Sequence, residues 1–139
     1  MIPMRHRPVQ FFFAVQIFLC GFLFFLADMI GLNSMPLAVY GAAAYDIDAE
    51  VWALGFMSAP LLVMVGVLIN GRRRWSPIPR SAGWLMLLLM SSYLGVSAWS
   101  SDAGAHVTIY ALVMVAPASA VFLGINLADM IVRMRRDPR

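Results

Sequence analysis

Residues 51–71 read VWALGFMSAPLLVMVGVLING, an apolar stretch without a single charge. A helix that rises ~1.5 Å per residue needs about 20 such residues to cross roughly 30 Å of hydrocarbon. Three further uncharged stretches of similar length cover residues 8–27, 81–101 and 103–128. Because backbone groups within lipid must bond to one another, we predict four transmembrane helices, over residues 8–30, 50–70, 81–101 and 104–133.

The composition of the whole chain is typical of a membrane protein. Of 139 residues, 62% are hydrophobic and 12% are charged, whereas a soluble domain carries about 45–50% apolar and about 25% charged residues. This balance excludes an ordinary soluble enzyme, a disordered tail and a disulfide scaffold. Cys20 is the single cysteine, so an internal disulfide is excluded as well. We expect residues 1–139 to form a single transmembrane domain.

Charge is divided between the connecting segments. All ten basic residues are arginines, and they lie in the N-terminal segment, in residues 71–80 and after residue 132. The other two connections hold acidic residues and no arginine. Since the basic residues of short loops stay in the cytoplasm, we predict an all-α, integral membrane four-helix bundle with both termini cytoplasmic. Residues 31–49 then form an outer loop, and residues 71–80 form a cytoplasmic basic loop.

A fifth helix over residues 29–45 is the alternative to this topology, and it would invert every later segment. The stretch is short and interrupted by Gly31, Pro36 and Gly41, which are typical of turns, so an ordered outer loop is favoured. The first apolar run exceeds the core of about 7–15 residues that a signal peptide has, and no cleavage motif follows it. We therefore expect a retained first helix.

The basic loop contributes four candidate ligands for anionic lipid headgroups: Arg72, Arg73, Arg74 and Arg80. These side chains could equally bind an acidic partner. Their use as membrane anchors explains the net charge of +3 without nucleic-acid binding. The helix after this loop starts from Ser76 or Ser81 as its N-cap, and the former choice places Pro77 in the first turn.

Small residues mark two helices as candidates for close packing. Gly55 and Ala59 are four residues apart in the second predicted helix. The last helix repeats a small residue at every fourth position: Ala116, Ala120, Gly124 and Ala128. Such a stripe allows another helix to approach closely, either within one protomer or between protomers. Pro60 and Pro117 predict kinks in the same two helices.

Three polar side chains of the last segment are candidates for function: Asn126, Asp129 and His106. An ionisable residue within a span is by default a functional candidate. The simpler interpretation pairs Asp129 with Arg133, one helical turn later. His106, at the outer end, is then a solvated or locally paired histidine, and a proton-relay or pH-sensing role is the alternative. Gln16 is expected to form an interhelical hydrogen bond or to snorkel.

Tryptophans near the predicted helix ends, at positions 52, 84 and 99, are expected to anchor the chain at the membrane interfaces. The two histidines, His6 and His106, fall on opposite sides of the predicted membrane, so they cannot share a haem or a metal. None of the usual zinc, phosphate-loop or nucleophile motifs is present. We therefore expect no enzyme activity and assign no catalytic, cofactor or metal residues.

Four stretches of the chain carry a family resemblance: residues 35–41, 52–55, 67–77 and 126–129. The turn from Asn70 to Pro77 and the sequence from Asn126 to Asp129 are the most similar parts. Here the chain resembles small polytopic membrane proteins encoded by tailed bacteriophages of alphaproteobacteria. The resemblance covers most of residues 35–130. It implies a phage setting and an inner-membrane location, but no activity and no site residues.

Three functions remain open at this stage. The first is holin-like permeabilisation of the membrane by an oligomer, which fits the small size, the several spans, the basic tail and the small-residue stripe. No predicted helix, however, has a strong polar face to line a hole. The second is a non-catalytic accessory, assembly or superinfection-exclusion protein that acts by helix–helix contact. The third is a small transporter or channel subunit. The expected partners are the lipid bilayer and either further copies of the chain or another membrane protein.

Overall fold

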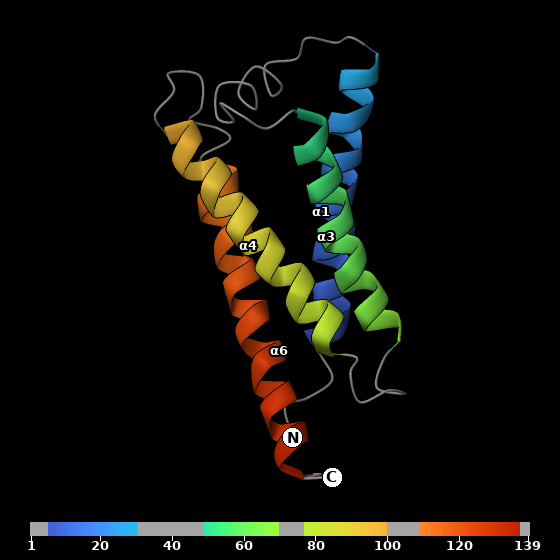
Figure 1. Ribbon diagram of the computed structural model, residues 1–139, viewed down its shortest axis with the longest axis vertical. Coiled ribbons are helices and arrows are strands. Elements are labelled where there is room, and N and C mark those ends of the chain that lie inside the picture. The colour runs from blue at the N-terminus through green and yellow to red at the C-terminus, as the bar shows by residue number, and fades with distance from the viewer. Residues whose placement is uncertain (1–5, 31–48, 70–76, 100–108, 137–139) are drawn as a thin grey trace.

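The computed structural model describes residues 6–30, 49–69, 77–99 and 109–136. Every element within these residues is helical. In chain order they are α1 (His6–Met29), α3 (Ala49–Leu68), α4 (Pro77–Trp99) and η1 (Ile109–Val115), a π-helical segment that continues directly into α6 (Ala116–Arg136) (Figure 1). The expectation of an all-helical bundle is confirmed at this level.

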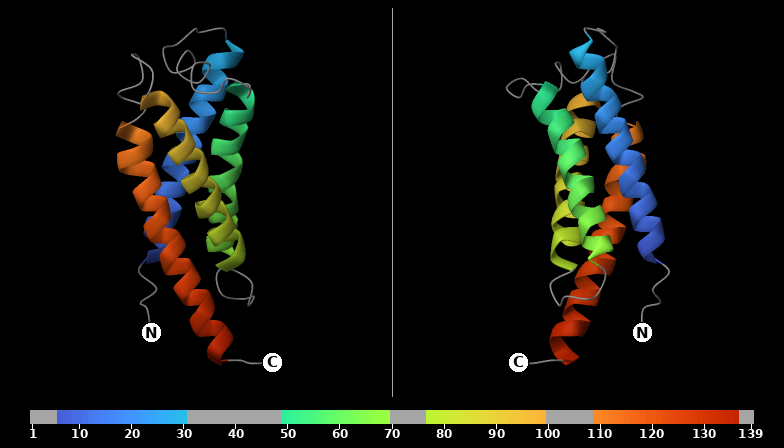
Figure 2. Two further views of the ribbon diagram at one scale, coloured as in Figure 1. Left: turned by 60° about the vertical axis from the view of Figure 1, so that its left-hand side comes forward. Right: turned by 90° about the vertical axis from the view of Figure 1, so that its right-hand side faces the viewer.

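The helices run alternately up and down. In all three ribbon views, α1 packs beside α3, and α4 packs beside both α3 and α6 (Figures 1 and 2). The start of α1, the end of α3, the start of α4 and the end of α6 lie at one end of the bundle, which we call the basic end. The last turns of α6 extend beyond the other helices at this end.

Three of the described helices are long and apolar enough to cross a membrane. The qualifying segments are His6–Leu23, Val51–Leu68 and Val113–Val132. The remaining helix, α4, has 23 residues but is not among them. A membrane protein is thus supported by length and composition.

The start of α4 differs from the predicted helix boundary. The helix begins at Pro77, within the segment expected to form the basic loop, so Ser81 lies inside the helix and is not its N-cap. Proline is well suited to the first helical position. An N–H group there has no intrahelical partner, so the lack of this group in proline loses no hydrogen bond. Several predicted features lie outside the described residues: Ser76, residues 70–76 with Arg72, Arg73 and Arg74, residues 31–48 with the alternative fifth helix, and His106.

The two prolines sit differently in their helices. Pro60 lies inside α3, which continues to Leu68. Pro117 is the second residue of α6 and follows the π-helical turns of η1. A proline ring clashes with the carbonyl group four residues before it, and a wider turn relieves that contact. The π-helix before Pro117 therefore accommodates the proline ring.

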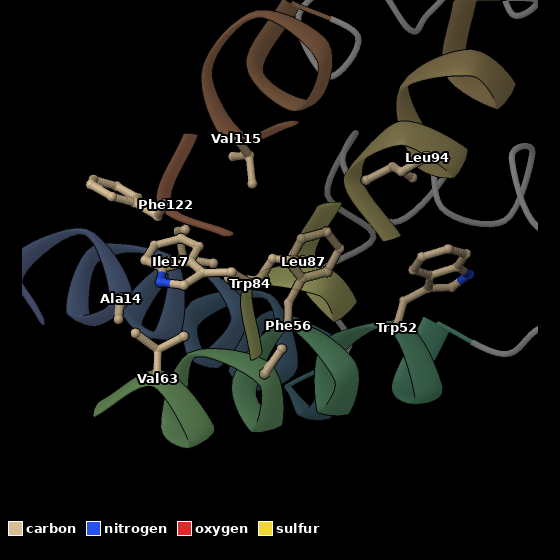
Figure 3. Packing of buried hydrophobic residues seen from close by; sticks show 11 residues of the cluster. Ala14, Ile17, Trp52, Phe56, Val63, Trp84, Leu87, Leu94, Val115 and Phe122 are labelled. Carbon is tan, nitrogen blue, oxygen red and sulfur yellow. The ribbon is translucent and has the colours of Figure 1, made fainter. Parts of the chain in front are cut away.

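An apolar core fills the space between the helices, with Trp84 at its centre (Figure 3). The ring of Trp84 lies 4.7 Å from that of Phe122, centroid to centroid, and Phe13 meets Phe122 edge-on at 5.8 Å. Trp52 is also buried and stacks on Tyr93. The expected role of Trp84 and Trp52 as interfacial anchors is therefore corrected: both rings fill space between helices.

Glycines allow α3 and α4 to approach closely. A Cβ atom at Gly83 would lie 2.6 Å from the carbonyl oxygen of Ala59 and 2.7 Å from a methyl group of Val63. One turn before Ala59, the buried Gly55 of α3 faces the side chain of Met90. The structure thus places the predicted packing residues Gly55 and Ala59 in the α3–α4 contact, together with Gly83, which the sequence pattern had not singled out.

Candidate functional site

The most polar region of the described bundle is a buried cluster near its basic end. Its centre is the side-chain amide of Gln10 on α1, which is 1% exposed. The Gln10 Nε2 group donates to Oδ1 of Asn126, at 3.4 Å. The Gln10 Oε1 atom accepts from Nδ2 of Asn126 and from Nε1 of Trp84, each at 3.4 Å. One amide thereby connects α1, α4 and α6.

These three hydrogen bonds mainly provide partners for buried polar groups and add little to the free energy of folding. Distances of 3.4 Å exceed the usual range of about 2.7–3.2 Å, so each bond is weak. A buried donor or acceptor without any partner would nonetheless cost about 1–3 kcal/mol. The amide cluster therefore favours the one rotation of α1, α4 and α6 that brings all three side chains together.

An ion pair lies next to the amide cluster on the side of the basic end. Arg80 precedes Trp84 by one turn of α4, and Asp129 follows Asn126 by one turn of α6. The Arg80 Nη2 atom lies 3.6 Å from Oδ2 of Asp129. Only 3% of the Arg80 side chain is exposed, against 32% of Asp129. The pair therefore links α4 to α6 with its carboxylate side open to the surroundings.

Gly66 on α3 makes room for the Arg80 side chain. A Cβ atom at this position would lie 2.5 Å from Cγ of Arg80 and 3.0 Å from its backbone nitrogen. Any larger residue would push the aliphatic stem of Arg80 away from α3. All four long helices thus contribute to the cluster: α1 through Gln10, α3 through Gly66, α4 through Trp84 and Arg80, and α6 through Asn126 and Asp129.

The position of Arg80 corrects one prediction. The sequence suggested a loop arginine that binds lipid headgroups, but Arg80 lies in the first turn of α4 and is buried. The early start of the helix at Pro77 explains the difference, because it turns Arg80 toward α3 and α6. For Asp129, the structure shows Arg80 as an ion-pair partner; the side chain of the predicted partner, Arg133, is outside the described part of the chain.

The predicted stripe on the last helix does not form one buried face. Ala116 is buried and Ala128 is half-buried, but Ala120 and Gly124 are exposed. A Cβ atom added at Gly124 would meet nothing within 4 Å. Besides Ala116, the residues that α6 turns inward are Ser119, Phe122 and Asn126.

Sequence reasoning found Asn126 and Asp129 but missed Gln10 and Trp84 as their neighbours. Gln10 sits near the start of its helix, where a polar side chain is expected to reach water. Gln16, nearer the middle, was the more obvious candidate, yet it is exposed. One pattern in the sequence could have indicated the cluster. Gln10, Trp84 and Asn126 lie at similar distances from the basic ends of three predicted helices.

The cluster holds no arrangement typical of catalysis. Its members are two amides, an indole, a guanidinium and a carboxylate, with no nucleophile beside a base. Within the described segments, no three His, Cys, Asp or Glu side chains lie close enough to hold a metal ion. The cluster can instead hold three helices in one rotation and keep its charged groups away from an apolar surrounding.

Comparisons with known proteins give no relative. No protein-family model matches the chain, and neither the curated proteins nor the solved structures contain a significant match.

Proposed function

We propose that the chain is a four-span protein of the bacterial inner membrane, with both termini in the cytoplasm, that acts without catalysis through helix–helix contacts. It would serve as an accessory subunit, an assembly factor or a superinfection-exclusion factor. The observation that carries this proposal is the direction of the polar side chains. Gln10, Trp84, Asn126 and Arg80 are all buried and bond within the chain.

The same cluster supports the proposal of α4 as a fourth span. Its charged side chain, Arg80, lies in the first turn and is shielded by α3 and α6. The rest of α4 carries no charge. A span of 23 residues with its arginine at one end and facing the bundle is compatible with lipid. A green fluorescent protein fused to the C-terminus should be fluorescent, as it is in the cytoplasm; a dark fusion would reverse the topology.

The outward surface supports an interaction role over a hole. Most exposed side chains along the described helices are aliphatic or aromatic. Among the polar exceptions, Ser58 donates its hydroxyl to the carbonyl oxygen of Gly55 in its own helix. An assembled hole requires a water-facing side on at least one helix, and the described helices present none. The exposed small residues Ala120 and Gly124 instead allow a foreign helix to approach α6.

Holin-like permeabilisation is the second candidate. The exposed Ala120 and Gly124 also allow self-assembly through α6, and the end of that helix is basic, with Arg135 exposed. The two candidates differ in what expression does to a bacterial host. An oligomer that opens the membrane collapses the membrane potential at a reproducible delay, whereas an interaction protein leaves the potential intact.

The test is induced expression followed with a potential-sensitive dye and an impermeant DNA stain. We expect intact potential, normal growth and co-purification of a stoichiometric membrane partner in mild detergent. Gly124→Leu should abolish that co-purification, because it fills the approach to α6. Val65→Leu, which adds bulk at an exposed position of α3, is the matched control and should have no effect. Abrupt depolarisation with dye entry would replace the proposal with the holin-like function.

A further inference from the structure

Gln16 is a polar side chain on the outside of the bundle. It lies near the middle of the apolar part of α1, it is exposed, and it forms no hydrogen bond with any residue that the structure describes. The inward face of the same helix is formed by Gln10, Ala14 and Ile17. Within hydrocarbon, an amide without a partner is costly, and a hydrogen bond to another helix removes that cost.

Exposed apolar residues extend from Gln16 in both directions along α1. They recur at alternating intervals of three and four residues: Val9, Phe12, then Leu19, Leu23 and Leu26. With Gln16 included, these positions follow the heptad repeat by which two helices pack in a left-handed supercoil. We call this row of six residues the α1 seam. No described residue of the chain covers it.

We propose that two copies of this chain pair through the α1 seam, with the amide of Gln16 bonding to Gln16 of the second copy. A carboxamide carries both donors and an acceptor, so two of them are complementary to each other. Copies that insert in one orientation bring their α1 helices together in parallel. A two-fold axis along the membrane normal then places both Gln16 side chains at the same depth.

A second copy is the occupant that the seam fits best. A different partner would need a polar group at the depth of Gln16 and an apolar row with the same repeat. A second copy of this chain has both features. A single polar residue in such a seam is also a recognised means of fixing register and the number of helices. The inference rests on the membrane placement proposed above, but it does not depend on the role of α6.

The first experiment measures dimerisation by energy transfer between labelled copies in phosphatidylcholine vesicles. Gln16→Leu keeps the apolar packing and removes the amide, so dimerisation should weaken by about three- to tenfold, the range found for hydrogen bonds between membrane helices. Gln16→Asn should retain most of the affinity. Ser58→Ala is the matched control, since it removes an exposed polar group whose hydroxyl already bonds to its own helix. Equal dimerisation of Gln16→Leu and the unaltered protein would overturn the proposal.

The second experiment tests which surface meets its copy. In a Cys20→Ala background, Leu19→Cys or Leu23→Cys should give disulfide-linked dimers on oxidation. Leu54→Cys, at an exposed position on α3, should not. Cross-links confined to position 54, or a strictly monomeric protein, would overturn the pairing. A monomer that still captures a partner through α6 would leave the proposed function standing, so the two failures are distinguishable.

Discussion

Gln10 and Gln16 are identical residues on one helix, six positions apart, in opposite surroundings. At ~3.6 residues per turn, six positions place them on different faces of α1. Gln10 is buried and bonds to α4 and α6, whereas Gln16 is exposed. Gly83 and Gly124 repeat the contrast, since a Cβ atom would collide with α3 at the first and meet nothing at the second. Residue type therefore does not determine role in this protein; the rotation of each helix does.

The largest expected effect concerns the charged part of the inner region. Asp129→Asn removes the negative charge beside Arg80, which is 3% exposed. Removal of one partner of a buried pair costs about 3–5 kcal/mol, and the partial exposure of Asp129 places the expected loss at about 3 kcal/mol. The free energy of unfolding, measured by titration with sodium dodecyl sulfate in mixed micelles, should fall accordingly.

The control for this effect is the same substitution in an Arg80→Met background. Without the buried guanidinium, Asp129→Asn should change the free energy of unfolding by less than about 1 kcal/mol. An equal loss in both backgrounds would mean that the pair of charges is not what Asp129 contributes.

The next effect contrasts the two glycines. Gly83→Ala forces α3 and α4 apart and should lower the free energy of unfolding by about 1–3 kcal/mol, as overpacking of a tight contact does. Gly124→Ala adds the same methyl group where there is space, and alanine favours the helix by up to about 1 kcal/mol over glycine. Thermal unfolding in detergent should therefore show a lower Tm for the first variant and an equal or higher Tm for the second. Equal Tm changes would contradict the close approach at Gly83.

The smallest effect contrasts the two glutamines. Gln10→Leu leaves the indole N–H of Trp84 and the amide of Asn126 without their partner and should cost about 1–2 kcal/mol, limited by the length of the bonds. Gln16→Leu should change the stability of the monomer by less than about 0.5 kcal/mol, because the Gln16 side chain is exposed and bonds to no residue that the structure describes. Unfolding measured at high detergent-to-protein ratio, where copies are separated, tests both. A larger loss for Gln16→Leu would reverse the assignment of the two faces of α1.

The sequence predicted the helices well and their faces poorly. Long uncharged runs indicated helices in the four regions where the structure has them, since length and apolarity suffice for that inference. The inward or outward direction of Gln16, Trp84 and Ala120 was not predictable in the same way. A soluble helix reveals its core side by amphipathicity, but here the core and the lipid are both apolar, so the hydrophobic pattern carries little information on direction.

For the candidate site, Asn126 and Asp129 stood out because polar residues are rare in the last helix. Arg80 was misplaced because charge alone assigned it to a loop. Its actual position depends on two features of other residues: Pro77 starts α4 early, and Gly66 on α3 leaves space for the side chain. Gln10 could be recognised as part of the site only once α4 and α6 lay beside it.

By itself, the sequence determined that this protein is helical, that three of its described helices have the length and apolarity of membrane spans, and where arginine and acidic residues separate along the chain. These properties are local, because they depend on runs of neighbouring residues and on the need of backbone groups to bond within a helix. The tertiary structure decided which side of each helix meets another helix. That choice depends on contacts between residues far apart in the chain, such as Gln10 with Asn126 and Arg80 with Asp129. Burying and pairing the few polar groups favours one arrangement among many apolar surfaces of nearly equal energy.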